Sequence, residues 1–471
     1  MPNTAIVWFR RDLRLADNPA LDRARRDHEH IVPVFIDDTA VDRNSIRGAA
    51  SRWWLHHSLA ELDRRLRDRG SRLVLARGDV LAVLRRILNV CGAEAVYWNR
   101  VYEPARVERD RDVKRTLRSE GVTVASCNGS LLFEPWQLLK DDGTPYRVFT
   151  PFWKQMQKHW MVPAACPEPR QLAAPKRWPA SLALEKLEFL PKVSWADGFN
   201  KHWSPGELGG RRRLEHFIGQ AVGDYDSRRD RPGIEGTSRL SPHLHFGEIS
   251  PAQVVRALDE AGELPAGRGR WSFLREIAWR EFSTHLLFHY PHLPGKPLNP
   301  VFDAFPWRQR ADYISDLEAW QRGSTGIPMV DAGMRELWAT GWMHNRVRMV
   351  VASFLTKNLL VPWQEGARWF WDTLVDADLA NNTQGWQWTA GCGADAAPYF
   401  RVFNPVLQGE KFDPDGRYVR RWCPELAGRK GKRIHQPLDP DESEHFDYPL
   451  PCVDLKRSRQ RALEAWQRIR S

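Results

Sequence analysis

Five short apolar segments alternate with amphipathic stretches in the first part of the chain. The apolar segments are typical of buried strands and cover residues 5–9, 31–36, 73–75, 95–98 and 122–124. Between them, apolar residues recur at helical spacing in residues 51–69, 80–88 and 107–117. Right-handed helical crossovers join parallel strands, so residues 1–134 are predicted to form a doubly wound parallel α/β domain. No G-x-G-x-x-G motif follows the first strand, which argues against an ordinary dinucleotide site there.

The hydrophobic pattern changes twice further along the chain. Closely spaced prolines leave no room for long elements in residues 135–205, which are predicted to be an interdomain connector on the surface. After Gly209 the strand patterns disappear and helical periodicity dominates as far as Leu374. Residues 206–471 are therefore predicted to be a second, all-helical domain, whose last residues, about thirty of them, form a charged and irregular tail.

Composition narrows the class of protein. With 42% hydrophobic and 27% charged residues, the chain is expected to be folded and soluble rather than disordered. Its apolar runs are short and interrupted by charges, and Met1 leads directly into a strand-like segment, so we expect no membrane helix, no signal peptide and a cytoplasmic protein. The six cysteines include no C-x-x-C pair, so no zinc or iron–sulfur site is expected.

Charge and aromatic content point to possible partners. The net charge of +11 and the pI near 9.5 favour a polyanion such as nucleic acid. The chain has 23 tryptophans, and 13 of them stand at or after Trp271. This distribution suggests that the second half uses indole rings for its function.

Three segments of the helical half combine residues that can carry chemistry. The hydroxyls, arginine and backbone N–H groups of residues 237–242 suit a diphosphate, although they also suit a capped helix start. Glu276, Trp279 and Arg280 share one helical face, as do Asn345, Arg348 and Met349. A surface Glu–Arg pair and the polar edge of a core are the plainer interpretations of these two faces.

The third segment, residues 375–388, concentrates acids, amides and two indoles in fourteen positions with little amphipathicity. Buried amides and acids cost free energy unless they are paired, which favours a lined cavity over a polar interhelix loop, the alternative interpretation. Basic residues also stand beside aromatics at 228–231, 346–348, 401 and 411–412, as phosphates next to a stacking pocket require, although a solvated face has the same pattern.

Motifs along nearly the whole chain resemble those of the photolyase/cryptochrome flavoprotein family, and most closely its class I cyclobutane pyrimidine dimer photolyases. The matching segments are residues 7–14, 236–241, 279–282, 341–346, 378–382, 385–388, 395–401 and 403–405. The resemblance implies an α/β domain followed by a helical domain that holds FAD in a bent shape beneath a DNA-facing cavity. The implied activity is light-driven repair of pyrimidine dimers in DNA by a lyase.

By this resemblance, one set of residues binds the cofactor. The positions that match FAD contacts are Tyr225, Thr237, Ser238, Arg239, Leu240, Ser241, Arg280, Arg348, Asp376, Asp378 and Asn382. Arg348 and Asp376 are expected to form an ion pair beside the flavin, Asn382 to face its N5 and Asp378 its ring edge. A negative flavin needs a positive charge nearby, which Arg348 supplies if Asp376 neutralises it only in part.

A second set is expected to bind the substrate. The positions that match the substrate pocket are Glu276, Trp279, Asn345, Met349 and Trp388, and those that match contacts to the DNA backbone are Arg229, Arg346, Arg401, Gln408 and Lys411. In the family, reduced FADH⁻ absorbs blue light and passes an electron to a dimer flipped out of the duplex. Glu276 would hydrogen-bond the base carbonyls, as a donor if burial keeps it protonated.

The family also implies an electron relay and an antenna. Trp386, Trp363 and Trp307 match the tryptophans that carry electrons from the surface to oxidised FAD. Methenyltetrahydrofolate or a deazaflavin is the usual antenna, but Ala105 and Arg106 stand where folate binders often place an amide and an acid, which leaves its identity open. We expect a monomer.

Two other functions remain open within the family. A (6-4) photolyase would be expected to have histidine where Asn345 stands and another near Met349. A cryptochrome photoreceptor would signal rather than repair. Because repair and signalling share one flavin pocket, the sequence does not exclude a secondary sensory role.

Overall fold

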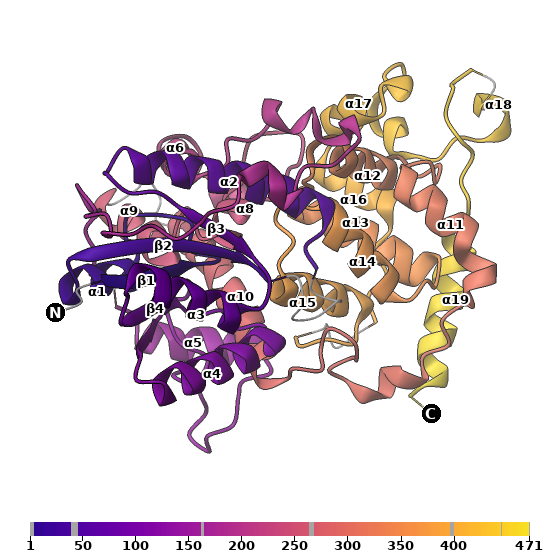
Figure 1. Cartoon of the computed structure of the whole chain (residues 1–471). Helices are drawn as coiled ribbons and strands as arrows, with labels where there is room; N and C mark the ends of the chain where they lie inside the picture. Colours follow the sequence, from indigo (N-terminus) through magenta and orange to yellow (C-terminus); the bar gives the residue numbers. More distant parts are fainter. Residues whose placement is uncertain are drawn as a thin grey trace.

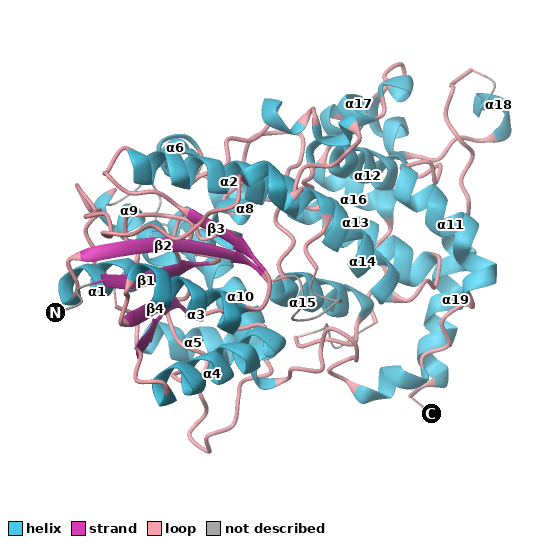
Figure 2. Cartoon of the chain, in the orientation of Figure 1, coloured by secondary structure: helices cyan, strands magenta, loops and turns pink. Residues whose placement is uncertain are grey.

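A single parallel sheet organises the first part of the chain (Figure 2). The computed structural model describes residues 4–38, 46–161, 164–262, 268–395, 400–443 and 445–470. The strands are β1 Thr4–Phe9, β2 His30–Asp37, β3 Val74–Arg77, β4 Ala95–Asn99 and β5 Thr123–Cys127. They pair in parallel in the order β3-β2-β1-β4-β5, which confirms the five predicted strands and the doubly wound topology.

Alternating side chains direct the helices to the two faces of the sheet. Ala5, Val7 and Phe9 of β1 pack with helices α1 (Pro19–Asp27) and α2 (Ala49–Arg67). Ile6 and Trp8 pack on the opposite face with α3 (Val80–Cys91) and α4 (Pro104–Ser119). Because successive side chains of a strand point to opposite faces, the central strand β1 is buried on both sides by these two layers.

The segment that follows the sheet is more than a surface connector. Within residues 135–205 lies helix α5 (Phe149–Lys158), together with 3-10 turns at Leu184–Leu187, Ser194–Ala196 and Phe199–Lys201. Phe149, Phe152 and Met156 of α5 are buried beside helix α10 (Arg268–His289). The prediction of a segment wrapped on the surface is thus wrong for α5, which buries an apolar face.

The second half of the described chain is helical, as predicted (Figures 1 and 2). Besides α10, its helices are α6 Glu207–Gln220, α7 Tyr225–Arg228, α8 Ser241–His245, α9 Pro251–Glu260, α11 Arg310–Arg322, α12 Pro328–Thr340, α13 Asn345–Ser353, α14 Trp363–Thr373, α15 Leu379–Ala390, α16 Pro405–Phe412, α17 Arg417–Trp422, α18 Pro440–Ser443 and α19 Leu455–Arg468. Short 3-10 turns lie at Pro300–Ala304, Pro424–Leu426 and Gly431–His435, and a π-helical turn at Phe354–Asn358. In the described part of the chain, no helix is long and apolar enough to cross a membrane.

The C-terminal residues are ordered rather than an irregular tail. Helix α19 runs along the right-hand edge of the molecule in Figure 1. Its Trp466 stacks on Phe302, with ring centroids 5.0 Å apart, and on Phe400 at 5.3 Å. The tail prediction is wrong because these few apolar contacts fix a helix whose sequence is mostly polar.

Helix α2 joins the two halves into one core. Its Trp53 and Trp54 pack with Phe199, Trp203 and Trp342 in the same hydrophobic cluster as the sheet. The indole Nε1 of Trp54 donates a hydrogen bond of 2.8 Å to Glu248, which precedes α9. The sheet therefore supports the helical half directly.

Candidate functional site

Helices α10, α13 and α15 bring ten of the predicted site residues together. Helix α15 contacts both α10 and α13, and Figure 1 places it at the centre of the molecule. Each helix supplies residues of the predicted cofactor and substrate sets, namely Glu276, Trp279, Arg280, Asn345, Arg346, Arg348, Met349, Asn382 and Trp388, and α15 also carries Trp386 of the predicted relay. Three helices that are far apart in sequence thus meet. Residues 379–388 lie in α15, so the alternative interpretation of residues 375–388 as an interhelix loop is wrong for most of that segment.

Local capping and packing fix the orientation of α15. Asp378 is its N-cap and accepts a hydrogen bond of 3.0 Å from the Asn381 backbone N–H. The Asn382 amide donates to the Ala367 carbonyl of α14 at 3.0 Å. Gly366 on α14 lies against the Trp386 ring, where an added Cβ would come within 2.0 Å of an indole carbon. The glycine therefore permits the close approach that seats Trp386 between the two helices.

An ion pair links α13 to the segment before α15. The Arg348 Nη2 donates to both Asp376 carboxylate oxygens, at 2.8 Å and 3.1 Å, and Arg348 Nε donates to the Met343 carbonyl at 2.8 Å. The side chain of Asp376 is 3% exposed, while that of Arg348 is 24% exposed. The accessible end of the pair is therefore the positive one.

A second charge cluster surrounds Asp378. His245 contacts its carboxylate at 3.3 Å and Arg11 at 3.5 Å, and Arg11 also pairs with Glu103 at 2.5 Å. Burial alone would raise the pKa of Asp378, but the hydrogen bond from His245 and the charges of Arg11 and Arg280 lower it overall. Burial and the charge of Arg11 lower the pKa of His245, so this imidazole is neutral beside an ionised carboxylate.

Glu276 pairs with Arg229 and not with Arg280 on its own helix. The Arg229 Nη1 donates to Glu276 Oε1 at 2.6 Å, and the guanidinium lies 5.5 Å from the ring centroid of Tyr225. Burial raises the pKa of Glu276, although Arg229 opposes the shift. The interpretation of Glu276 and Arg280 as a surface ion pair is thus wrong, since Arg280 donates instead to the Ser130 carbonyl at 2.8 Å.

The two tryptophans of the predicted substrate set are each held by a contact within the protein. Trp279 stacks on Phe149 of α5, with ring centroids 3.7 Å apart and planes 6° apart. The Trp388 indole donates to the Asp395 carbonyl at 3.0 Å. Phe149 was missed in the sequence because it lies in the proline-rich connector, and the one signal for it was its i, i+3 spacing with Phe152. Asn345 is exposed and Met349 half-buried at the start of α13.

The hydroxyl-rich segment adopts a strained turn. Arg239 has a left-handed φ of 51° and lies over the Trp342 ring at 4.9 Å. Ser238 Oγ accepts from the Leu240 N–H at 3.3 Å, and Ser241 Oγ accepts from the Trp342 indole at 3.2 Å. Thr237 is half-buried beside them. Two of the three hydroxyls thus have protein partners, and the N-cap of α8, Leu240, has no side-chain capping hydrogen bond.

The predicted DNA-contact residues differ in how they are partnered. Arg346 pairs with Asp230 at 2.8 Å, and Arg229 is held by Glu276. Arg401 and Lys411 are exposed, and no carboxylate among the described residues pairs with either. Gln408 is half-buried on α16, and residues 396–399 of the adjoining motif lie outside the described residues. Only part of the predicted basic set is therefore free for phosphates.

The three predicted relay tryptophans belong to one hydrophobic cluster. Trp386 and Trp363 are buried, each 2% exposed, and Trp307 is packed at the edge of the cluster beside Phe305, at 4.4 Å. Trp386 also contacts Phe370 at 5.0 Å and Trp320 at 6.2 Å, two aromatics that sequence reasoning did not single out. The burial decreases from Trp386 to Trp307, as a path to the surface requires.

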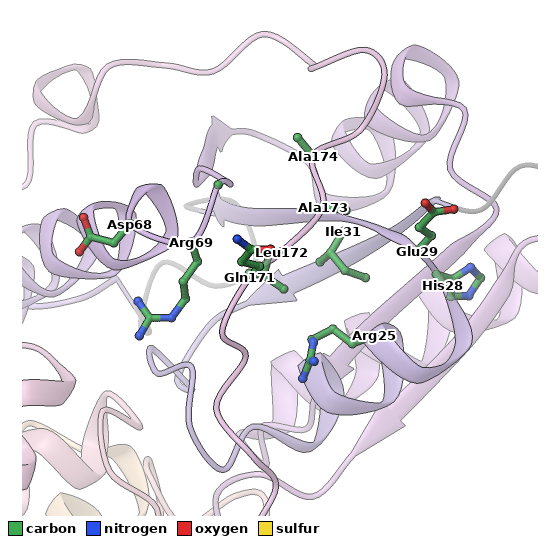
Figure 3. Close-up of a pocket in the computed structure, with 11 residues that line it drawn as sticks. Arg25, His28, Glu29, Ile31, Asp68, Arg69, Gln171, Leu172, Ala173 and Ala174 are labelled. Carbon is green, nitrogen blue, oxygen red and sulfur yellow. The ribbon is translucent and has the colours of Figure 1, made fainter.

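A surface groove of about 620 Å³ lies elsewhere, on the α/β domain (Figure 3). It runs between the ends of α1 and α2 and residues 171–174, and none of the predicted site residues lines it. Arg69 donates within the protein to the Pro169 carbonyl at 3.0 Å and to the Arg65 carbonyl at 2.8 Å, and Asp68 accepts from Arg64 at 3.1 Å. Much of the charge that lines the groove is thus already paired with other groups of the protein.

Two family models match the chain. The model described as "DNA photolyase" covers residues 5–170, and that described as "FAD binding domain of DNA photolyase" covers residues 273–468. A protein named deoxyribodipyrimidine photo-lyase from Agrobacterium fabrum is 48% identical, with 99% of this chain and 98% of the relative covered. Cryptochrome-1 of Arabidopsis thaliana is 38% identical over 98% of this chain and 70% of its own length. The crystal structure of a bacterial class III photolyase from Agrobacterium tumefaciens superposes with a TM-score of 0.94 at 48% identity, covering 100% of this chain and 98% of that one.

Proposed function

Because the chain belongs to the photolyase/cryptochrome family, we propose that it repairs cyclobutane pyrimidine dimers in DNA with blue or near-UV light. The full-length relative named deoxyribodipyrimidine photo-lyase makes the chain an enzyme of the lyase class, and the match to the FAD-binding domain identifies FAD as its cofactor. The choice of substrate and the roles of individual residues are the proposal.

The Arg348–Asp376 pair is the observation that carries this proposal. When bound, reduced FAD supplies the electron that light drives into a dimer. Arg348 presents its accessible positive end, while the negative end, Asp376, is buried behind it. Such a pair stabilises an anion beside it, because one guanidinium offers several donors and the carboxylate accepts from only one nitrogen. We assign Asn382 and Asp378 to the flavin ring, and the turn at Thr237–Ser241, Tyr225 and Arg280 to the rest of the cofactor.

Glu276 and its aromatic neighbours fit a pair of extruded pyrimidines. Trp279 and Trp388 offer flat apolar walls, and Trp279 is held in place by Phe149. A carboxyl whose pKa is raised can donate a hydrogen bond to a base carbonyl, and Arg229 keeps it oriented. Asn345 and Met349 complete this set, and neither can deliver the proton that a (6-4) photoproduct requires.

The class of photolyase is the finer part of the assignment. The class I resemblance is not supported, because the solved relative at 48% identity is named a class III photolyase. We therefore infer that the chain belongs to class III. We further propose a monomer in the cytoplasm, with UV-damaged DNA as its partner and a methenyltetrahydrofolate or deazaflavin antenna.

A photoreceptor role is the second candidate, because Cryptochrome-1 of Arabidopsis thaliana is 38% identical over 98% of this chain. Repair and signalling need the same flavin pocket, so they are separated by assay and not by the pocket residues. Purified protein that bleaches and recovers under blue light without removing dimers would favour the photoreceptor.

The deciding experiment is blue-light repair of two oligonucleotides, one with a cyclobutane dimer and one with a (6-4) photoproduct. We expect loss of the dimer alone. The Glu276→Ala variant should keep FAD and repair less efficiently by about 1–3 kcal/mol, the cost of one buried hydrogen-bond partner. Repair of only the (6-4) substrate would overturn the assignment.

A further inference from the structure

A buried lysine lies beneath the segment that leads to the predicted DNA contacts. Lys357 is 1% exposed and belongs to the π-helical turn Phe354–Asn358, which follows α13. Its ammonium lies 3.5 Å from the ring centroid of Phe400 and donates to the Arg401 carbonyl at 3.2 Å. No carboxylate among the residues with described positions forms an ion pair with it. Its charge is therefore balanced by an aromatic face and a carbonyl.

The ring that Lys357 contacts is held from its other sides. Phe400 stacks on Trp466 at 5.3 Å with planes 10° apart, and it lies 5.8 Å from Phe305 and 6.4 Å from Phe302. The next residue, Arg401, is exposed. Lys357 thus contacts Phe400, the buried residue that directly precedes the exposed Arg401.

Burying a lysine at this position costs folding free energy. Its burial lowers the pKa of Lys357 to about 7, and an apolar side chain of similar length would avoid that cost. Residues that raise the free energy of the fold are typical of positions retained for function. The π-helical turn is a second sign, because such turns occur often at functional sites.

We propose that Lys357 is a positioning residue for DNA binding, acting through its contacts with Phe400 and the Arg401 carbonyl to aim the Arg401 side chain at the phosphate backbone. The proposal rests on the proposed function, since Arg401 contacts DNA only if the chain binds damaged duplex. Lys357 itself touches neither the DNA nor the cofactor.

The charge of Lys357 gives the proposal a pH signature. Cys392, just after α15, is the titratable neighbour that acts on Lys357, and burial raises the pKa of this thiol to about 12, so that it stays neutral. One other cation meets the turn, because Arg461 of α19 donates to the Asn358 carbonyl at 2.7 Å. Glu365 of α14 accepts from Tyr313, Arg346 pairs with Asp230 and Arg348 with Asp376, while the charge of Asp303 acts on Cys392. Deprotonation of Lys357 removes the cation–π attraction, so the hold on Phe400 weakens as pH rises through about 7.

The test measures affinity for dimer-containing duplex in the dark, with FAD-loaded protein at pH 6.2 and 8.5. At pH 6.2, Lys357→Met should bind about tenfold more weakly than wild type, and the two should converge at pH 8.5. The thermal midpoint of Lys357→Met should be equal or higher, because it removes a buried charge. Thr356→Val is the matched control, because Thr356 is buried in the same turn and its hydroxyl donates to the Ala352 carbonyl, and it should keep wild-type affinity.

A double-mutant cycle separates this inference from the proposed function. Arg401→Ala should weaken binding, and adding Lys357→Met to it should cause no further loss if the lysine acts through Arg401. Additive losses, or wild-type affinity in Lys357→Met at pH 6.2, would overturn the inference while Arg401→Ala still weakens binding. Wild-type protein that shows no preference for dimer-containing duplex would instead overturn the proposed function.

Discussion

The carboxyl edge of the sheet and the centre of the helical half both concentrate charge, but they use it differently. Doubly wound sheets commonly bind ligands at this edge, beside the point where strand order reverses between β1 and β4. There, Arg10 pairs with Asp110, and both Arg106 and Arg109 pair with Asp38. Arg10 and Arg109 also lie over the Trp8 ring, at 4.5 Å and 4.9 Å. These charges satisfy one another within the protein.

Around α15 the charges are satisfied only in part. Among the described residues, Arg348 is the ion-pair partner of Asp376, and Arg229 that of Glu276. Both arginines remain about a quarter exposed, while the ion pairs at the sheet edge are more deeply buried. A saturated network stabilises the fold, whereas an accessible cation beside a buried acid can still bind a ligand. The described charges at the sheet edge are thus the more fully paired, and the chemistry that we propose uses the helical half.

The largest expected effect tests whether only the helical half supplies electrons to the flavin. Trp386→Phe removes the indole next to Gly366 and should reduce photoreduction of oxidised FAD more than tenfold, because phenylalanine is far harder to oxidise. Chemically reduced protein should still repair. Absorbance under blue light measures the reduction.

The matched control for Trp386 is in the α/β half. Trp98 is equally buried and packs edge-on against Trp8 at 5.6 Å. Trp98→Phe should leave photoreduction unchanged, and a similar loss in both variants would remove the functional difference between the two regions.

The next largest effect tests whether a buried carboxylate with one ion-pair partner depends on that partner more than a carboxylate with two. Arg348→Met leaves Asp376 buried without its cation and should cost about 3 kcal/mol of unfolding free energy, as well as FAD retention. Arg109→Met leaves Asp38 with Arg106 and should cost about 1 kcal/mol. Chemical unfolding of both variants measures the difference, and equal losses would contradict the contrast between single and redundant partners.

Two buried glutamates should respond to pH with opposite signs. Burial raises the pKa of Glu281, next to Arg280 on α10, to about 7, so its contribution to stability is complete below pH 4.5 and lost as pH rises through 7, about 3 kcal/mol in all. Burial would also raise the pKa of Glu103 at the sheet edge, but Arg11 and Arg106 lower it overall, so its contribution is present above pH 4.5 and lost on acidification.

Urea unfolding at pH 4.5 and 8 checks both signs. Glu281→Gln should gain stability over wild type at pH 8 and not at pH 4.5. Glu103→Gln should lose stability at pH 8, with the deficit shrinking at low pH. The same direction in both variants would mean that the two regions do not differ in electrostatics.

The smallest effect concerns which cations are free for DNA. Arg401 and Lys411 should each contribute about 0.9 to the slope of log affinity against log salt, which is about a tenfold loss of affinity between 50 and 200 mM for the pair. Replacing both by alanine should reduce the slope by about 2. Arg229→Ala should change it less, because Glu276 already neutralises that charge. If Arg229→Ala reduced the slope as much as the loss of Arg401 or Lys411 does, the ion pair between Arg229 and Glu276 would have to open on DNA binding.

The fold was largely predictable where apolar periodicity is strong. All five strands and the helices α2, α3 and α4 follow from local patterns. Helix α1 was missed although Asn18 caps it and Pro19 begins it, because its nine residues carry few apolar side chains. Helix α5 depends on burying Phe149 and Phe152 against α10, a contact that no local window contains.

Of the ion pairs in the site, only Arg348–Asp376 was predicted, from the family resemblance, and the structure confirms that pairing. The others were not predicted. Glu276 and Arg229 are 47 positions apart, and Arg346 and Asp230 are 116 apart. Periodicity assigns a residue to a helix face, but tertiary packing decides which faces meet. The same limit explains why Lys357 and its contact with Phe400 gave no signal in the sequence.

The core that α2 shares with the helical half bears on whether the two halves can exist apart. Cutting the chain after residue 134 would expose Trp53 and Trp54 and leave Glu248 without its indole donor. Neither fragment would then have a complete hydrophobic core. The boundary between the halves therefore marks a change from α/β to helical architecture and does not separate two independently folding domains. Heating should accordingly melt sheet and helices in one cooperative transition, and the α/β half expressed alone should aggregate rather than fold.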